Sequence, residues 1–215
     1  MLRRVILSGP GRLFSVLVGV MIVAIVLGSS AAQASSDGSD FEPVFESSMP
    51  EGFPPYTPVG EIEVKHYPGY RKAESAGRVA FWTLFRHISN ANISMTAPVE
   101  MTYQEEGPPV GREQAMAFLY GDPSLGEPGR QGNVDVSDVP PMTVVSIGVR
   151  GARTNAAVSA AHTRLLDWLG EHAERYEQHG PVRVMGYNSP FVPRDRQFFE
   201  VQIPIRERAG AAADA

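Results

Sequence analysis

The hydrophobic residues of this chain recur in the order strand, helix, strand, strand, and the same order occurs twice. Alternation with a period of two is typical of a half-buried strand, whereas apolar residues three and four positions apart are typical of a helix. In the first half, two short extended pieces precede the helix. The segments of that half are GEIEVKHY (60–67), YRKAE (70–74), AGRVAFWTLFRHIS (76–89), NISMTAPVEMTY (92–103) and QAMAFLY (114–120).

The second half repeats the order with different residues. Met142–Gly151 is rich in β-branched residues and predicts a strand. A helix is expected from Asn155, which can cap it, to about His179. Residues 182–187 and 198–205 predict two further strands. Together these segments predict an α+β domain, in which duplicated β-α-β-β units form a curved or barrel-like antiparallel sheet with two helices packed on it.

The first predicted helix carries an unusually aromatic stripe. Four apolar residues fall at helical spacing: Val79, Trp82, Phe85 and Ile88. Phe81 widens this stripe, and Arg78 and Arg86 flank it. The pattern alone favours ordinary core packing for the aromatic residues, with the arginines in solvent. The alternative is an aromatic wall with a basic rim, which suits a flat apolar ligand that carries carboxylates.

The methionine-rich segment that follows this helix alternates. One face of the predicted strand would carry Ile93, Met95, Ala97, Val99 and Met101. Core packing is favoured over copper ligation for the methionines, because thioether side chains adapt to apolar surroundings. Pro98 has no backbone donor, so the strand is expected to lie at a sheet edge or to carry a bulge.

The N-terminal segment has the order of a secretory signal. Arg3, Arg4 and Arg12 precede the uncharged apolar run Leu13–Leu27, and Ala32-Gln33-Ala34 follows as a site of small residues. This order predicts a signal peptide over residues 1–34 that is cleaved after Ala34, and the alternative is a retained membrane anchor. The protein is therefore expected to be exported (periplasmic or extracellular), or membrane-anchored through this segment if it is retained.

Composition sets the remaining domain boundaries. Residues 35–58 are rich in Ser, Pro, Gly and acids, and they predict a linker because such a segment buries little apolar surface. A folded domain over 59–206 and a disordered tail over 207–215 complete the expected organisation.

Charge and motif content exclude several classes of function. The chain has no cysteine, which excludes disulfides, thiolate metal sites and cysteine nucleophiles. Its net charge is −5, and loss of the three signal arginines leaves 16 basic residues (19 minus 3) against 24 acidic ones, or −8. This balance argues against a nucleic-acid partner. The sequence contains no nucleophile elbow, H-E-x-x-H, P-loop or dinucleotide motif, so no enzyme is predicted.

Three segments together resemble the SOUL/haem-binding protein family. They are EVKHYPGYRKAE near the start, NISMTAPVEM after the first helix, and GYNSPFVPRDRQFFEVQIPI at the end, so the resemblance spans about residues 60–205. It implies duplicated β-α-β-β units, as in the effector-binding domains of some bacterial regulators. It also implies non-covalent binding of haem or a related tetrapyrrole in an apolar groove, without catalysis.

The resemblance places the groove between the first helix and the loop before the last strand. The ligand-binding residues that it implies are Arg78, Phe81, Trp82, Phe85, Arg86, Pro190, Phe191, Val192, Pro193 and Arg194. His87 and His66 are candidate axial ligands, since neutral imidazole is a common haem ligand. The chain departs from the family pattern in carrying Asn-Ile-Ser-Met after the helix, where many members have a basic residue.

Two alternative functions remain open at this point. The same groove can serve a different lipophilic ligand or a protein partner. A hydrolase is the other alternative, for which Glu200 beside Phe199 is the candidate acid. Glu200 is expected to point away from the core if Phe199, Val201 and Ile203 face it. The protein is expected to be a monomer.

Overall fold

A computed structural model describes residues 41–104 and 111–209 of the 215-residue chain. The predicted signal segment, residues 1–34, lies outside the described residues. The same holds for residues 35–40 of the predicted linker and 210–215 of the predicted tail. Among the helices of the described ranges, none is long and apolar enough to cross a membrane.

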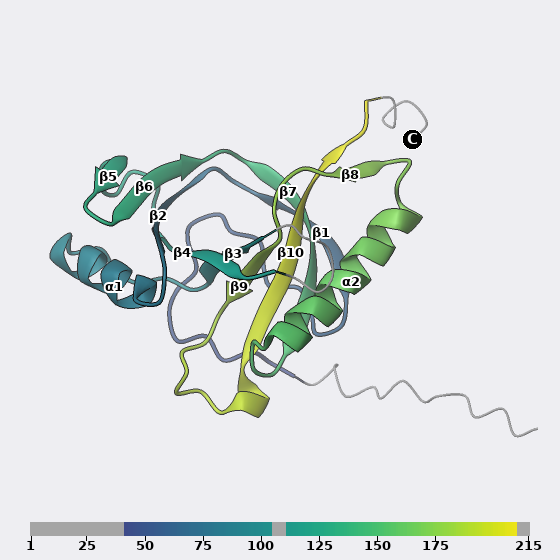
Figure 1. The fold of residues 1–215 in the computed structure, drawn as a ribbon, viewed down its shortest axis with the longest axis horizontal. Coiled ribbons are helices and arrows are strands. Elements are labelled where there is room, and N and C mark those ends of the chain that lie inside the picture. Colours follow the sequence, from purple (N-terminus) through teal and green to yellow (C-terminus); the bar gives the residue numbers. More distant parts are fainter. Residues whose placement is uncertain (1–40, 105–110, 210–215) are drawn as a thin grey trace, which may run out of the picture. The chain divides into compact units, whose positions relative to one another are not determined.

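The described residues form ten strands and two α-helices (Figure 1). A short 3₁₀ helix, η1 (Arg194–Arg196), precedes the last strand. The elements are β1 (Ile62–Tyr67), β2 (Tyr70–Ala76), α1 (Ala80–Asn90), β3 (Val99–Tyr103), β4 (Glu113–Leu119), β5 (Gly129–Gln131), β6 (Val134–Val139), β7 (Met142–Arg150), α2 (Asn155–Glu171), β8 (Tyr176–Gln178), β9 (Arg183–Gly186) and β10 (Phe198–Glu207).

The strands pair antiparallel in one sheet with the order β1-β7-β10-β9-β3-β4-β2-β6-β5, and β8 pairs with β10 off this path. This confirms the predicted α+β fold with an antiparallel sheet. The order ends at β1 and β5, so the sheet of the described residues is open. At its centre β3 pairs with β9, where Glu100 lies opposite Met185 and Met101 opposite Val184.

The predicted duplication is visible on the two sides of this central pair. One unit is β2-α1-β3-β4 and the other is β7-α2-β9-β10, each with its first strand paired to its last. The opening strand β1 does not pair with the unit that follows it in sequence. It lies beside β7 in the other unit, with Val64 opposite Val145, while β6 takes the corresponding position beside β2.

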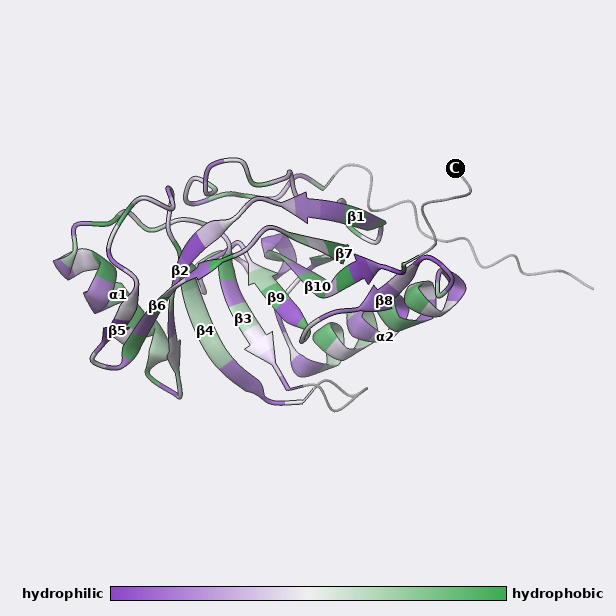
Figure 2. Ribbon diagram, turned by 90° about the horizontal axis from the view of Figure 1, so that it is seen from above, coloured by the Kyte–Doolittle hydropathy of each residue, from purple (hydrophilic) through white to green (hydrophobic). Residues whose placement is uncertain are grey.

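The two helices pack on one sheet, as predicted, and the structure places them on the same face of it. Alternate residues of β10, including Phe199, Val201 and Ile203, lie in the core under α2. On the same face, Phe118 of β4 and Val136 of β6 pack under α1. Figure 2 shows the helices at opposite ends of the sheet. A single face therefore holds two adjoining cores, one for each helix.

Helix α2 differs from its prediction at both ends. Thr154, and not Asn155, is the N-cap, and its Oγ1 accepts a hydrogen bond from the backbone N–H of Ala157 at 3.2 Å. The helix ends at Glu171, well before His179. The helical prediction fails beyond this point because β8 pairs with the end of β10, a non-local contact that overrides the local pattern.

The methionine-rich segment is a strand only from Val99 onward. Pro98 precedes β3, so it takes no place in the ladder, and the expected edge position is wrong because β4 and β9 flank β3. A shift of register does occur, between Thr102 and Tyr103. Met101 is buried in the α2 core, which confirms its predicted packing role.

The opposite face of the sheet is covered by the segment predicted to be a linker. Phe41, Met49, Phe53 and Tyr56 pack there against a cluster that includes Tyr187. We call residues 41–58 the N-terminal strap. The linker prediction is wrong for these residues, because their scattered aromatic side chains find apolar partners on the sheet that composition alone does not show.

Candidate functional site

Helix α1 presents aromatic side chains to solvent because a different stripe faces the sheet. Ala80, Leu84 and Ile88 are buried, and their spacing of four residues keeps them on one side. Trp82 is 65% exposed and Phe85 is 44% exposed. The prediction that Val79, Trp82 and Phe85 share a core stripe with Ile88 is therefore wrong for all but Ile88. The small Ala80 and the branched Leu84 fit the sheet more closely than the large rings.

The exposed rings are supported by rings beneath them. Phe81 is half-buried and contacts Phe118 of β4 edge-to-face, with ring centres 5.3 Å apart. On its outer side it meets Trp82 at 5.4 Å and Phe85 at 6.3 Å. This ladder holds a two-ring surface in a defined position, which resembles the wall of a binding site more than a set of loose surface side chains.

Two arginines lie beside this surface. Arg78 precedes α1 and Arg86 lies on it, and both are exposed. Arg86 follows Trp82 by four residues and so lies on the same side of the helix, whereas Arg78 lies in the turn two residues before Ala80. An exposed guanidinium near an aromatic face suits a carboxylate at the edge of a bound ligand.

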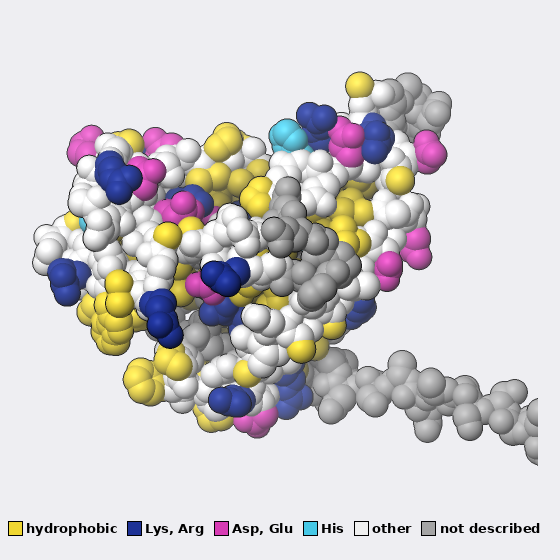
Figure 3. All heavy atoms as spheres, viewed as in Figure 1, with side chains coloured by type: hydrophobic (Ala, Val, Ile, Leu, Met, Phe, Trp, Pro, Cys, Tyr) yellow, Lys and Arg dark blue, Asp and Glu magenta, His cyan; other side chains and the backbone are white. Residues whose placement is uncertain are grey.

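The second predicted wall is the loop between β9 and β10. Phe191 is 92% exposed, Val192 is half-buried, and Pro190, Pro193 and Arg194 are exposed. The loop is held in shape by Gln197, whose Nε2 donates to the carbonyl of Val192 at 2.8 Å. Figure 3 shows hydrophobic side chains gathered over α1 and over this loop on the same face of the molecule, with basic side chains near both.

Neither histidine candidate joins this surface. His87 lies about 140° around α1 from Trp82, and its Nε2 is 2.8 Å from the hydroxyl of Tyr120. Burial lowers the pKa of His87, which disfavours protonation of the ring. His66 lies on β1, which is six strands away from β2 in the order of the sheet. The Nδ1 atom of His66 is 3.0 Å from Thr143 Oγ1. Across the described ranges, no three His, Asp or Glu side chains are grouped to hold a metal ion.

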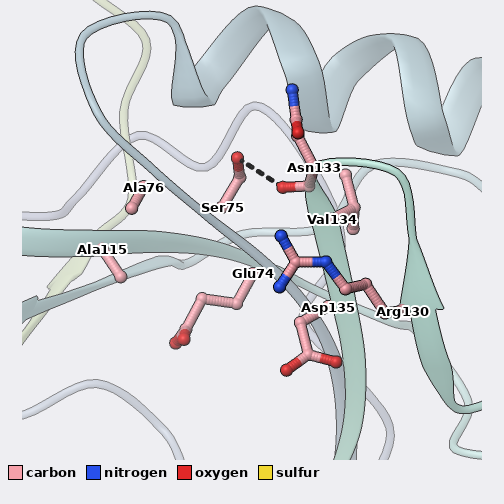
Figure 4. Close-up of a pocket in the computed structure, with 8 residues that line it drawn as sticks. All are labelled: Glu74, Ser75, Ala76, Ala115, Arg130, Asn133, Val134 and Asp135. Atoms are coloured by element: carbon pink, nitrogen blue, oxygen red, sulfur yellow. Dashed lines mark hydrogen bonds between the residues drawn. The ribbon is translucent and has the colours of Figure 1, made fainter.

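A separate small cavity lies between β2, β4, β5 and β6 (Figure 4). Its volume is about 200 Å³, below the roughly 300–1,000 Å³ of most small-molecule pockets. Glu74, Arg130 and Asp135 are among its lining residues, and Ser75 donates to the carbonyl of Asn133 at 3.0 Å. The cavity is small and polar, so it does not suit a flat apolar ligand.

The sequence prediction missed a cluster of charged side chains under the strap. Glu100 is 4% exposed, Arg183 is 4% exposed and Glu200 is fully buried. Glu200 does point away from the α2 core, as alternation predicts, but it faces the strap and not solvent. The available signal was a charged or amide residue at positions that alternate with core residues, as Glu200 and Gln202 do in β10.

Comparison with known proteins agrees with this fold. The model of the SOUL heme-binding protein family matches residues 53–204. No curated protein matches the sequence.

Solved structures show the same architecture at low identity. The C-terminal domain of EcmrR is similar with a TM-score of 0.52 at 13% identity, over 69% of this chain and 98% of that domain. EcmrR in a complex with DNA is similar with a TM-score of 0.55 at 12% identity, over 69% of this chain and 58% of that one. A hydrolase from Listeria innocua has a TM-score of 0.50 at 9% identity, over 70% of this chain and 94% of that one. At these identities the likeness concerns the fold alone.

Proposed function

Because the chain belongs to the SOUL heme-binding protein family, we propose that it binds haem or a related tetrapyrrole without covalent attachment. The proposed site is the aromatic face of α1 together with the loop at 190–194. The protein acts as a binding module in this proposal and catalyses no reaction.

One observation carries the proposal: α1 exposes two large aromatic residues, although its sheet-facing side is already filled by smaller ones. A contiguous exposed apolar patch often marks an interaction site, and aromatic rings that pack against one another form such a patch. The face suits a flat apolar macrocycle, and Arg78 and Arg86 suit the propionates at its edge.

The two candidate axial histidines fit the proposed site less well than the aromatic and basic residues do. His87 is bonded to Tyr120 and lies on another side of α1, and His66 lies at the far end of the sheet. We therefore propose that the protein recognises the macrocycle and its carboxylates, and not the metal. Metal-free protoporphyrin should then bind about as tightly as haemin.

The test is a titration of the full chain with haemin and with protoporphyrin. The sequence contains two tryptophans, so Trp168→Phe leaves Trp82 as the only one. In that variant, saturable quenching of tryptophan fluorescence by both compounds, together with a saturable Soret change for haemin, would support the proposal. Absence of both signals would remove tetrapyrroles and favour a different lipophilic ligand in the same groove.

A further inference from the structure

The face of the sheet opposite the helices contains a buried polar cluster. Its charged and amide members are at most 5% exposed and come from β1, β3, β9 and β10: Lys65, Glu100, Arg183, Glu200 and Gln202. Buried charges are costly, and replacing them with apolar residues is often neutral or stabilising, so such a cluster is poorly explained by stability alone.

The two carboxylates of the cluster are fully engaged. Lys65 Nζ lies 2.7 Å from Glu200 Oε1, and the Tyr187 hydroxyl donates to Glu200 Oε2 at 3.0 Å. Glu100 receives the Tyr70 hydroxyl at 2.7 Å and the guanidinium of Arg183 at 3.2 Å. Each carboxylate oxygen therefore already accepts at least one hydrogen bond, Glu100 Oε1 from Lys72 Nζ at 2.9 Å.

Arg183 has a donor to spare. Its Nη1 and Nε bond to Tyr70, Glu100 and Gln202, but its buried Nη2 has no hydrogen-bond partner. Burial opposes the charge on Arg183, but Tyr70 and Glu100 outweigh it and raise the pKa of the guanidinium. The guanidinium lies over the ring of Tyr67, 4.7 Å from its centre. A buried, charged N–H group without an acceptor is the feature that an anionic group would satisfy.

One side chain of the strap contacts the aromatic residues of this cluster. The ring of Phe53 meets Tyr67 edge-to-face at 4.9 Å and Tyr70 at 5.2 Å. The family match covers residues 53–204, so Phe53 lies within the matched range and residues 41–52 of the strap lie outside it.

Polar contacts attach the strap at several points along its length. In its middle, the carbonyl of Ser48 accepts from the backbone N–H of Ala97 at 3.0 Å, and the backbone N–H of Glu51 donates to the carbonyl of Gly121 at 2.9 Å. The carbonyl of Val44 accepts from Asn188, the carboxylate of Glu46 accepts from Ser189, and the backbone N–H of Thr57 donates to Glu200. Between these points the side chain of Phe53 is only half-buried.

We propose that this face is a second binding site, for a small aromatic anion, and that Phe53 of the strap is its intramolecular occupant. The Tyr67 and Tyr70 rings would pack against the aromatic body of the ligand, and Arg183 would bind its carboxylate. The strap is then an autoinhibitory cover, which the ligand displaces at the position of Phe53. This site is distinct from the face of α1, and it does not depend on the tetrapyrrole proposal.

The test is a calorimetric titration of the full chain with 2-naphthoate. Phe53→Ala removes the occupant, so this variant should bind 2-naphthoate at least roughly tenfold more tightly than the unmodified chain. A roughly tenfold gain in affinity corresponds to the free energy of burying one aromatic ring. The matched control is Phe45→Ala, in the same strap. Phe45 contacts Tyr56 and Tyr187 but neither ring of the proposed site, so this variant should leave the affinity unchanged.

Two further measurements on the Phe53→Ala protein locate the ligand. 2-Naphthylmethylammonium should bind at least about tenfold more weakly than 2-naphthoate, because only the anion can accept from Arg183. Adding Trp82→Ala, which alters the α1 face, should leave 2-naphthoate binding unchanged. Arg183→Lys, which keeps the charge beside Glu100 but removes the spare donor, should weaken binding.

The contrary outcomes are equally specific. A folded Phe53→Ala protein that binds 2-naphthoate no better than the unmodified chain would overturn the proposal and leave the strap as a purely structural cover. Equal binding of the two naphthyl compounds, or loss of binding with Trp82→Ala, would overturn the anionic specificity or the location. If Arg183→Lys does not fold, the comparison of the two naphthyl compounds still decides the question.

Discussion

Trp82 is the residue whose position differs most from its sequence prediction and matters most to the proposed function. A helical pattern identifies which residues share a side, but not which side meets the sheet. On α1 that choice was made by Ala80, Leu84 and Ile88, and the aromatic residues were left outside. The interpretation that the pattern favoured less, an aromatic wall with a basic rim, is the one that matches the exposure of Trp82 and Phe85.

The first prediction compares the aromatic wall with its rim. Trp82→Ala should weaken haemin binding by about tenfold, since a buried aromatic contributes roughly 1.5–3 kcal/mol. Arg86→Ala should weaken it by about fivefold or less, because a solvent-exposed ion pair is worth up to about 1 kcal/mol. Soret titrations at one ionic strength measure both effects, with Trp168→Phe as the control. A larger effect of Arg86→Ala would mean that charge dominates recognition.

The second prediction concerns Glu100 and acid stability. Burial opposes its ionisation, but Arg183 and Lys72 outweigh this and hold the pKa of Glu100 below its ordinary value of 4.5. The unfolded chain therefore binds more protons in this range, so stability present above about pH 4.5 should be lost as the pH falls through the folded-state pKa.

Calorimetric melting between pH 7 and pH 3 measures this loss. Glu100→Gln should lower Tm at neutral pH, because it leaves Arg183 without its counter-charge. It should also make the decline of Tm below about pH 4.5 shallower than in the unmodified chain. An equally steep decline in both proteins would assign the acid sensitivity to other carboxylates.

At the scale of elements, α2 depends on a cap that the sequence pattern misplaced by one residue. The third prediction is that Thr154→Ala costs about 1 kcal/mol of unfolding free energy, because the N–H of Ala157 loses its acceptor. Thr163→Ala is the matched control, since Thr163 lies on the exposed side of the same helix and bonds only to the carbonyl of Ser159. Denaturant unfolding should show only a small loss of unfolding free energy for Thr163→Ala. An equal loss in Thr154→Ala and Thr163→Ala would argue against a stabilising cap at Thr154.

The path of the strap over β7 depends on a glycine. A Cβ at Gly148 would overlap the backbone of Thr57 and Pro58, and the Gly148 carbonyl accepts from Gly60 N–H at 2.9 Å. The fourth prediction is that Gly148→Ala loosens the strap. Amide exchange and protease cleavage should increase within residues 41–58, before any change in the α2 core.

Gly170→Ala provides the comparison for that experiment. Gly170 lies in α2 with nothing within 4 Å of a Cβ, so alanine should be neutral or stabilising there. The contrary outcome is equally slow amide exchange in residues 41–58 of the Gly148→Ala and Gly170→Ala proteins. That result would mean that the strap does not require the close approach of Thr57 and Pro58 to Gly148.

At the scale of the whole molecule, we propose that residues 1–34 are a signal segment that directs export. The fifth prediction is that the mature chain begins at Ser35, because Ala34 ends a small-residue site after an apolar run. Mass spectrometry of the exported fraction should find this terminus. An intact N-terminus in the membrane fraction would show instead that the segment is retained as an anchor.

The sequence by itself determined the type and order of most elements. Alternation in residues such as Val144–Ile147, and helical spacing in segment 76–89, are local patterns that depend on which side chains must be buried. The duplicated order of these elements then predicted an antiparallel sheet with two helices packed on it. The motifs at both ends of the domain indicated the family in the same local way.

Only the tertiary structure decided which elements meet. β1 pairs with β7 across the repeat, β8 replaces the end of a predicted helix, and the strap covers a face that the composition left open. Each of these contacts joins segments far apart in the chain, so no local pattern specifies it. The cluster of Glu100, Arg183 and Glu200 was missed for the same reason. Alternation predicts that these side chains lie on the second face of the sheet. It does not indicate whether that face meets solvent, a ligand or a strap, which only the packing of the folded chain decides.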